Sequence, residues 1–225
     1  MLARMAGRTA AWLAGMGALL FGVAETWDWP GAWAFLGLMG VLSLGVGAWL
    51  ARHDPELLAE RLSPLWQPGQ QRWDKMLLAA VALLVVAWLA AMALDAGRWH
   101  LSHMPGWLQI VGATGPVASV WLSCLVFRAN RFAAPVVKLQ ASRGHAVATG
   151  GPYAVVRHPM YAGALFFFAG LPLLLGSWWG LAFVPALMAV LALRAVLEER
   201  LLILELPGYA AYAGKVRYRL VPGVW

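Results

Sequence analysis

Six long apolar runs dominate this sequence and restrict what it can fold into. A helix needs about 20 mostly apolar residues to cross the hydrocarbon core of a bilayer. Only 12% of the residues are charged, against about 25% in soluble domains. We therefore predict an all-α integral membrane protein with about six transmembrane helices, at roughly 10–24, 31–50, 76–94, 106–127, 160–175 and 181–193. The composition excludes a cytosolic enzyme, a disordered chain and the usual polar type of nucleic-acid binder.

The segments between the runs predict further detail. Residues 176–180 alone separate the last two runs, which predicts a tight helical hairpin. Residues 51–75 and 128–159 are too long to be plain turns. The first of them contains Asp54 and Pro55 ahead of residues 56–62, a pattern that predicts a short amphipathic helix with an aspartate cap.

Charge and tryptophan placement predict the orientation. Apart from Arg98, all lysines and arginines fall in segments on one side of the predicted spans, so both termini and the active site should face the cytoplasm. Tryptophans flank the predicted outer turns, as in an interfacial belt: Trp27, Trp29, Trp33, Trp99, Trp107, Trp178 and Trp179. The lone Cys124 and the histidine spacing predict neither a disulfide framework nor a metal site.

The densest polar pattern extends from Gly150 to Gly163, immediately before the fifth run. Pro159 suits the first turn of a helix and His158 its cap. A helix start offers free N–H groups to an anion, and Arg157 adds a bidentate cation. Anchoring at lipid headgroups would explain Arg157 and His158 alone, but Tyr161 on nearly the same face favours a binding site.

A second polar pattern lies at the end of the last run, where Arg194 and Glu198 are four residues apart and are expected to pair. Glu198 and Glu199 indicate either a solvated helix end or an acidic clamp for hydroxyls or an ammonium group. Combined with the helix start, they would complement the carboxylate, ammonium and ribose of S-adenosylmethionine. The sequence has no strand followed by Gly-x-Gly-x-x-Gly, which excludes a Rossmann site.

These patterns together resemble the isoprenylcysteine carboxyl methyltransferase family of integral-membrane methyltransferases. The resemblance is clearest over 145–153 and 157–163, and it continues through Arg194, the pair 198–199 and the segment 207–212. Residues 51–61 resemble bacterial members, and 1–127 otherwise match mainly in hydropathy. Where eukaryotic members have a longer acidic stretch before the final glutamates, this chain has Ala-Val-Leu at 195–197, so a prenylcysteine substrate does not follow.

The resemblance implies an N-terminal transmembrane region, 1–127, and a C-terminal catalytic region, 128–225, whose tail covers the cofactor site. It implies that a lipophilic or lipidated substrate enters from the bilayer and that Arg194 orients its carboxylate. Arg194 and Glu198 are the catalytic candidates. The residues implied to bind S-adenosylmethionine are His145, Val147, Gly151, Tyr153, Arg157, His158, Pro159, Tyr161, Gly163, Glu198 and Glu199.

The predicted function is therefore methyl transfer from S-adenosylmethionine to a carboxylate, or to another nucleophile, of an amphipathic substrate. The predicted location is a bacterial inner membrane, with lipids and no nucleic acid as partners. Two alternatives stay open, an NADPH-dependent membrane reductase resembling the sterol reductases and a non-enzymatic scaffold or transporter. The sequence does not predict the oligomeric state.

Overall fold

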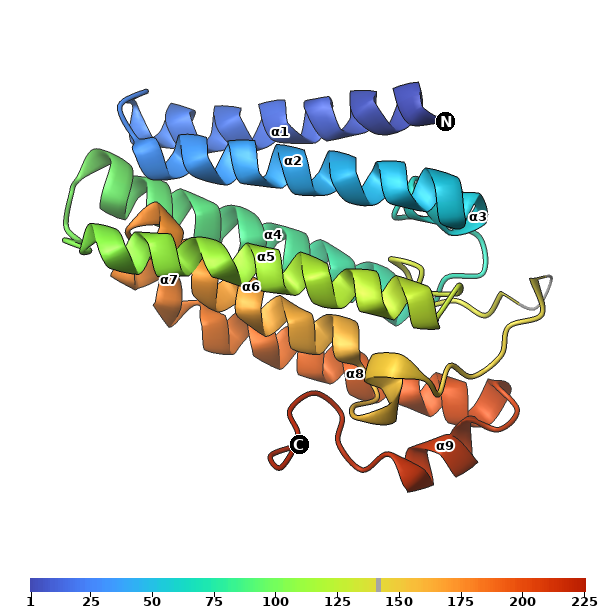
Figure 1. The fold of residues 1–225 in the computed structure, drawn as a ribbon. Coiled ribbons are helices and arrows are strands. Elements are labelled where there is room, and N and C mark those ends of the chain that lie inside the picture. The colour runs from blue at the N-terminus through green and yellow to red at the C-terminus, as the bar shows by residue number, and fades with distance from the viewer. Residues whose placement is uncertain (141–142) are drawn as a thin grey trace.

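Long antiparallel helices form the body of the molecule, which confirms the predicted all-α membrane architecture (Figure 1). The computed structural model describes residues 1–140 and 143–225. Within these residues, five segments are long and apolar enough to cross a bilayer: Leu2–Ala24, Pro30–His53, Arg72–Arg98, Gly106–Ala129 and Trp178–Glu205. The long α-helices are α1 (Leu2–Ala24), α2 (Pro30–His53), α4 (Arg72–Met92), α5 (Gly106–Ala129), α6 (Pro159–Leu175) and α8 (Val184–Glu205). Helix α6 is apolar but has only 17 residues.

Short elements connect and cap these helices. They are α3 (Pro55–Arg61), the π-helical turn η1 (Ala93–Arg98), the 3-10 turn η3 (Gly151–Ala154), α7 (Trp178–Ala182) and α9 (Tyr209–Lys215). Helix α3 confirms the predicted amphipathic helix, because Asp54 Oδ1 accepts a hydrogen bond from the Leu57 N–H at 2.9 Å. Pro55 occupies its first turn.

The predicted hairpin near the C-terminus is also confirmed. Gly176 ends α6 with a φ of 84°, a conformation that glycine adopts without strain, and Ser177 caps α7. The last helix continues to Glu205, well beyond its predicted end at 193. The apolar run stops near 193, but the following Ala, Leu, Arg and Glu residues are strong helix formers. The helix therefore extends beyond the apolar run, and this extension carries Arg194, Glu198 and Glu199.

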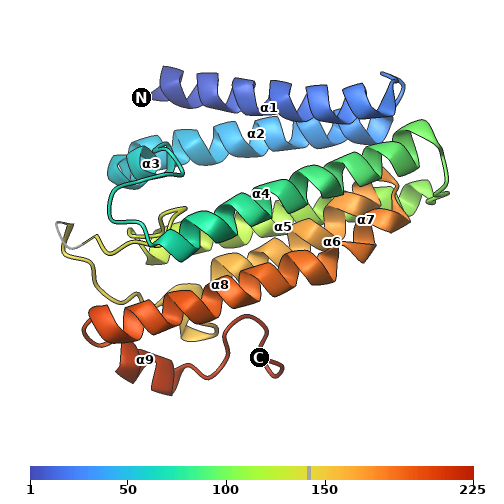
Figure 2. The same cartoon turned by 180° about the vertical axis from the view of Figure 1, so that it is seen from behind.

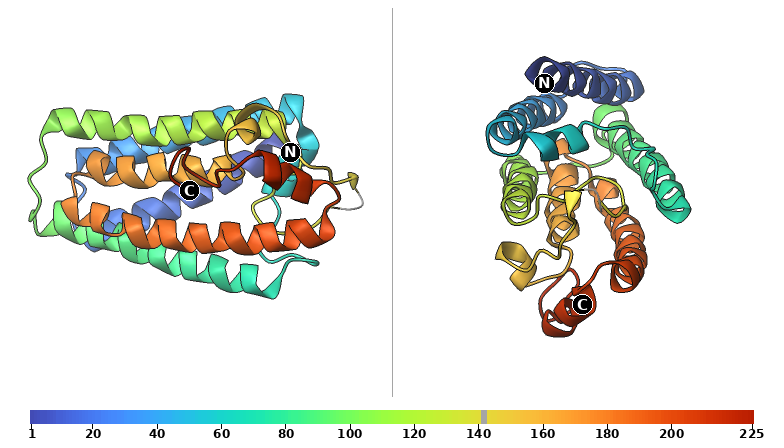
Figure 3. Two further views of the ribbon diagram at one scale, coloured as in Figure 1. Left: turned by 90° about the horizontal axis from the view of Figure 1, so that it is seen from below. Right: turned by 90° about the vertical axis from the view of Figure 1, so that its right-hand side faces the viewer.

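Different segments of the chain lie at the two ends of the bundle. The N-terminus, α3, α9 and the segment 130–140 lie at one end, and the turns 25–29, 99–105 and 176–178 lie at the other (Figures 1 and 2). The charge pattern assigns the first end to the cytoplasm, and that orientation stays a prediction. Seen end-on, α1 and α9 lie at opposite edges of the molecule (Figure 3).

One apolar core joins α1, α2, α4, α6 and α8, with Leu20, Phe35, Trp88, Leu171 and Leu187 among its buried side chains. The predicted regional boundary at 127/128 falls near the end of α5, and both regions contribute to this core. Trp29 was expected in the interfacial belt, but it is only 6% exposed. Its indole N–H donates to the Leu175 carbonyl at 3.1 Å, so this prediction is wrong. The Trp29 ring packs in the apolar core while its indole N–H keeps a hydrogen-bond acceptor.

Helices α5 and α6 approach each other through glycines. A Cβ atom on Gly170 would lie 2.6 Å from the Gly112 carbonyl oxygen and 2.7 Å from the Gly115 Cα atom. A Cβ atom on Gly115 would collide with the Phe166 carbonyl oxygen. Small residues allow this contact between helices that have no hydrophobic driving force in lipid.

Replacing Gly115 with Val should therefore destabilise the protein by about 1–3 kcal/mol, because the new side chain pushes against backbone rather than a movable side chain. Thermal unfolding in detergent micelles measures the effect. Gly45→Val is the matched control, because Gly45 lies in α2 with nothing within 4 Å of a new Cβ atom. Equal losses in the two variants would contradict the proposed close packing.

Candidate active site

The C-terminal tail, residues 206–225, pairs with the segment that precedes α6. Val156 and Tyr218 form a parallel bridge. The Arg157 N–H donates to the Tyr218 carbonyl and the His158 N–H to the Arg219 carbonyl, both at 2.9 Å. His158 is the N-cap residue of α6 and Pro159 lies in its first turn, as predicted. The tail therefore closes over the start of α6.

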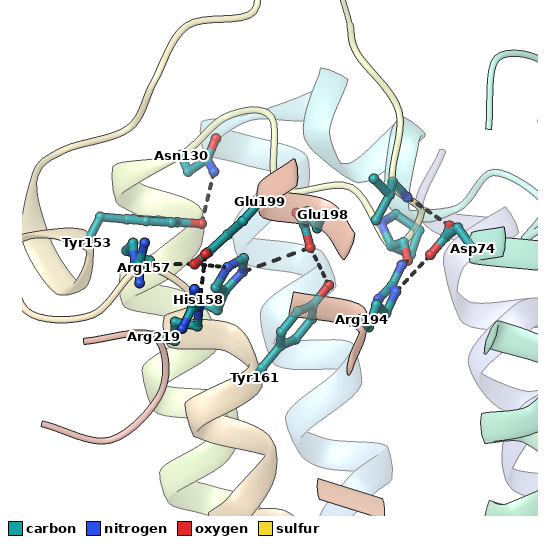
Figure 4. Close-up of polar contacts among 12 residues, drawn as sticks. Asp74, Asn130, Tyr153, Arg157, His158, Tyr161, Arg194, Glu198, Glu199 and Arg219 are labelled. Carbon is teal, nitrogen blue, oxygen red and sulfur yellow. Dashed lines mark hydrogen bonds and ion pairs between the residues drawn. The ribbon is translucent and has the colours of Figure 1, made fainter. Parts of the chain in front are cut away.

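A buried carboxylate holds this arrangement together. Glu199, on α8, is 3% exposed and is surrounded by Arg157, His158 and Arg219, with which it forms what we term the Glu199 cluster (Figure 4). Glu199 Oε1 lies 3.1 Å from His158 Nε2 and 3.2 Å from Arg157 Nε. Glu199 Oε2 accepts from Arg219 Nε at 2.9 Å. The anion expected at the start of α6 is thus the chain's own Glu199.

Glu198 points to a different neighbourhood from Glu199. The Tyr161 hydroxyl donates to Glu198 Oε2 at 2.7 Å, and His158 Nδ1 lies 3.9 Å from the same oxygen. The His158 and Tyr161 rings stack with centroids 5.4 Å apart and planes within 1°. The Tyr161 hydroxyl therefore orients the Glu198 carboxylate, which lies apart from the arginines of the Glu199 cluster.

Glu198 lines a cavity of about 110 Å³ that lies under the tail, between α6, α8 and the loop from α5. The lining residues come from the segments 130–138, 145–148, 153–161 and 198–212. Small-molecule sites usually measure about 300–1,000 Å³. A nucleoside therefore needs the loop or the tail to move outward before it fits.

Three tyrosines form much of the cavity wall. Tyr153 Oη accepts from Asn130 Nδ2 at 2.9 Å, and the Tyr212 hydroxyl donates to the Tyr153 carbonyl at 2.8 Å. Burial raises the pKa of Tyr212 to about 12, so it stays a donor at neutral pH. The Tyr209 hydroxyl is buried at the cavity and has no hydrogen-bond partner within residues 1–140 and 143–225. An unpartnered buried hydroxyl is costly unless a ligand meets it.

Most of the residues predicted to bind a cofactor meet at this cavity. Its lining includes His145, Val147, Tyr153, Arg157, His158, Pro159, Tyr161 and Glu198. The structure places Glu199 behind His158, in the Glu199 cluster. Gly163 lies against α5, where an added Cβ atom would be 3.4 Å from Leu122. Gly151 lines a separate groove on the other side of η3.

Arg194 does not pair with Glu198, so that prediction is wrong. Arg194 Nε donates to Asp74 Oδ1 at 2.8 Å, and Nη2 donates to the Pro135 carbonyl at 2.9 Å. Asp74 is completely buried, and a buried carboxylate requires a cation. Arg194 therefore pairs with Asp74 rather than with Glu198 on its own helix. Arg194 thereby joins α8 to α4 and to the loop that lines the cavity.

The sequence analysis missed Asp74, which also accepts hydrogen bonds from Gln70 Nε2 at 2.8 Å and from the Val137 N–H at 2.9 Å. Its only sequence signal is an isolated carboxylate two residues before an apolar run. Asn130 and Arg219 were also missed, because their partners lie 23 and 20 residues away along the chain.

His145 extends the cavity wall from the loop. Its Nδ1 atom accepts from the Gln140 N–H at 3.3 Å, and its ring lies 4.7 Å from that of Phe132, centroid to centroid. Burial lowers the pKa of His145 below its ordinary value. The imidazole is therefore neutral at pH 7 and presents no positive charge to a cationic ligand.

These features define a multi-pass α-helical membrane protein with a polar cavity at one end of its bundle. The model of the phospholipid methyltransferase family matches residues 107–204, from α5 to the end of α8. A solved structure of the eukaryotic intramembrane Ras methyltransferase ICMT (isoprenylcysteine carboxyl methyltransferase) is similar, with a TM-score of 0.53 and 19% identity. The alignment covers 96% of this chain and 75% of that chain. No curated protein sequence matches the chain.

The fold is thus ICMT-like, and the predicted resemblance is confirmed. At 19% identity the structural match establishes the fold, and the family match covers residues 107–204, less than half of the chain. Together they support a membrane methyltransferase. The family match, over 107–204, includes neither Asp74 nor the tail.

Replacing Asp74 with Ala should destabilise the protein by about 3–5 kcal/mol, because it leaves the buried Arg194 without its carboxylate. Unfolding in mixed micelles measures the loss. Glu25→Ala is the matched control, because it breaks the exposed ion pair with Arg98 at 2.9 Å and should cost about 1 kcal/mol or less. A loss at Asp74 no larger than that at Glu25 would contradict a structural role for the buried pair.

His145 should give the protein a pH-dependent stability. The unfolded chain protonates this histidine near pH 6.5, whereas the folded chain does so only at lower pH. Its contribution to stability is therefore complete above pH 6.5 and declines as the pH falls below that value. Thermal unfolding of wild type and His145→Gln at several pH values tests this, and the variant should lose less stability on acidification. Parallel losses would show that His145 is not responsible.

Proposed function

We propose that the protein transfers a methyl group from S-adenosylmethionine to a lipophilic acceptor, with the reaction at the cavity beneath the tail. The support is the combination of the phospholipid methyltransferase match with a cavity whose polar groups suit this cofactor. The carrying observation is Tyr209, which lines the same cavity as Glu198 and whose buried hydroxyl finds no partner among the described residues.

The residues present fit the cofactor chemically. Glu198 offers a carboxylate to an ammonium group or to ribose hydroxyls. Tyr209 offers a hydroxyl, and the neutral His145 offers an aromatic edge. The cationic residues of the lining, Lys138 and Arg157, contact Glu60 and Glu199, whereas Glu198 accepts from the Tyr161 hydroxyl. The Glu198 carboxylate in the lining suits a sulfonium compound.

The bound cofactor would supply an activated methyl group on its sulfonium sulfur. After the transfer, the rest of the cofactor would leave as a neutral thioether. The protein's part is to bind, orient and exclude water. Tyr161 fixes the Glu198 carboxylate, and the His158 ring stacked on Tyr161 fixes the tyrosine in turn. The tail keeps this end of the cavity covered through its backbone contacts with Arg157 and His158.

The two predicted catalytic residues have different surroundings. Glu198 faces the cavity, and we propose it as a binding and catalytic group. The Arg194 guanidinium donates hydrogen bonds to Asp74 and to the Pro135 carbonyl. A substrate carboxylate could therefore reach it only by displacing Asp74. We therefore propose that Arg194 is a positioning residue, which holds the loop 135–137 against α4. We also propose that the methyl acceptor binds without contacting Arg194.

The reductase alternative is less compatible with this cavity. NADPH carries an additional phosphate, which requires uncommitted cations, yet Lys138 and Arg157 are each committed to a carboxylate. A scaffold or transporter would not need a buried hydroxyl without a partner among the described residues at a cavity lining. Titration of the purified protein with S-adenosylmethionine and with NADPH separates these possibilities, and only the former should bind.

A pair of tyrosine variants tests the proposed cofactor site. Tyr209→Phe removes a hydroxyl without a partner among the described residues, so the stability of the ligand-free protein should not fall. The affinity for S-adenosylmethionine should fall about 2- to 12-fold, the effect of one neutral hydrogen bond. Tyr212→Phe is the matched control, because it breaks the internal bond to the Tyr153 carbonyl and should reduce stability by about 1 kcal/mol. Calorimetric titration and thermal unfolding give both quantities.

Unchanged cofactor affinity in Tyr209→Phe would remove the observation on which the site rests. The reaction itself is tested by incubating the protein with methyl-labelled donor and a total membrane lipid extract, followed by identification of the labelled product. A labelled lipid supports the proposed function, and binding of NADPH without methyl transfer contradicts it.

A further inference from the structure

A second, apolar depression lies on the other side of η3 from the cavity. It is a groove of about 820 Å³ between α5, α6 and the end of the tail. Leu122 and Leu125 of α5, Leu165 and Phe166 of α6, and the tail segment 220–222 form its walls. Figure 3 shows the tail running back beside α6, and the tail segment 220–222 lines the groove together with the two helices. Its volume is within the range of ligand sites.

The groove carries a cation at its charged end. Arg128, near the C-terminus of α5, lines it and is exposed. Within the described parts of the chain, Arg128 has neither a carboxylate nor a hydrogen-bond partner. A guanidinium at the edge of an apolar groove complements an amphipathic anion, and a guanidinium binds phosphate well. The combination suits an acyl chain joined to a phosphate.

The groove also adjoins the candidate active site. Pro159 lines both the groove and the cavity. Ala129 lines the groove while its neighbour Asn130 lines the cavity, and Pro152 and Tyr153 divide in the same way. The hydrogen bond of 2.9 Å between Asn130 Nδ2 and Tyr153 Oη therefore lies at the partition between the two spaces.

We propose that this groove binds a membrane phospholipid, with an acyl chain along α5 and α6 and the phosphate at Arg128, and that it presents the lipid headgroup to the cavity. The lipid site stands on its own observations, whereas its role in presenting an acceptor rests on the proposed methyl transfer. Pro159 and the residue pairs 129–130 and 152–153 border both spaces, which places the groove next to the cavity that Glu198 lines.

Photolabelling tests binding independently of catalysis. The protein is purified in detergent micelles and mixed with a phosphatidylethanolamine that carries a diazirine in its acyl chain, and labelled peptides are mapped by mass spectrometry. Labels should concentrate on 122–129 and 162–166. Unlabelled phospholipid should compete for them better than diacylglycerol, which lacks the phosphate. Labels spread evenly over all lipid-facing helices would overturn the proposal.

Variants sharpen this test. Arg128→Ala should reduce groove labelling about fivefold, the effect of one basic residue on an anionic lipid at a membrane surface. Arg52→Ala is the matched control, because Arg52 is exposed at the same end of the bundle on α2, away from the groove, and should leave labelling unchanged. Ala162→Phe places a ring in the groove and should abolish labelling. Equal labelling in Arg128→Ala and Arg52→Ala would overturn the phosphate site.

Kinetics connects the groove to the reaction. Arg128→Ala should raise KM for the phospholipid acceptor about fivefold and leave kcat and the affinity for S-adenosylmethionine unchanged. Methyl transfer whose KM is insensitive to both Arg128→Ala and Ala162→Phe would overturn the presentation of the acceptor while leaving the proposed function intact. Absence of any methyl transfer, with groove labelling as expected, would instead overturn the proposed function and leave the lipid site standing.

Discussion

The buried carboxylate of Glu199 is the contact on which the architecture of the site depends. It lies on α8 and binds Arg157 and His158 from the start of α6 and Arg219 from the tail. A carboxylate taken out of water is stable only with such partners, so their positions are fixed together. The tail, α6 and α8 consequently meet at one end of the bundle and enclose a cavity between them.

With Glu199 neutralised by its cluster, the adjacent Glu198 is the carboxylate that the cavity retains. The same distribution recurs one turn earlier on α8, where Arg194 is neutralised by Asp74. Charged groups that hold helices together are thus paired. Two of them, Lys138 and Arg157, also line the cavity, together with Glu198 and tyrosine side chains. The pairing of the structural charges allows a polar site to exist beside lipid without weakening the bundle.

Much of the fold was predictable because it depends on local patterns. Apolar runs gave the helices, Asp54 and Pro55 gave the start of α3, and Pro159 gave the start of α6. The site was predictable in part, since most of the residues singled out by their motif line the cavity. Pairings between distant segments were not predictable: Arg194 has an acid four residues away, yet it pairs with Asp74, 120 residues away. Burial decided that choice, and no local pattern records burial.

An experimental structure with bound S-adenosylhomocysteine would test the cofactor site most directly. Its carboxylate, ammonium and ribose should lie in the cavity beneath the tail, with the Tyr209 hydroxyl and the Glu198 carboxylate within hydrogen-bond distance of the ligand and with the Glu199 cluster intact. Ligand density elsewhere on the bundle, or in this cavity but out of reach of both side chains, would contradict the proposed site.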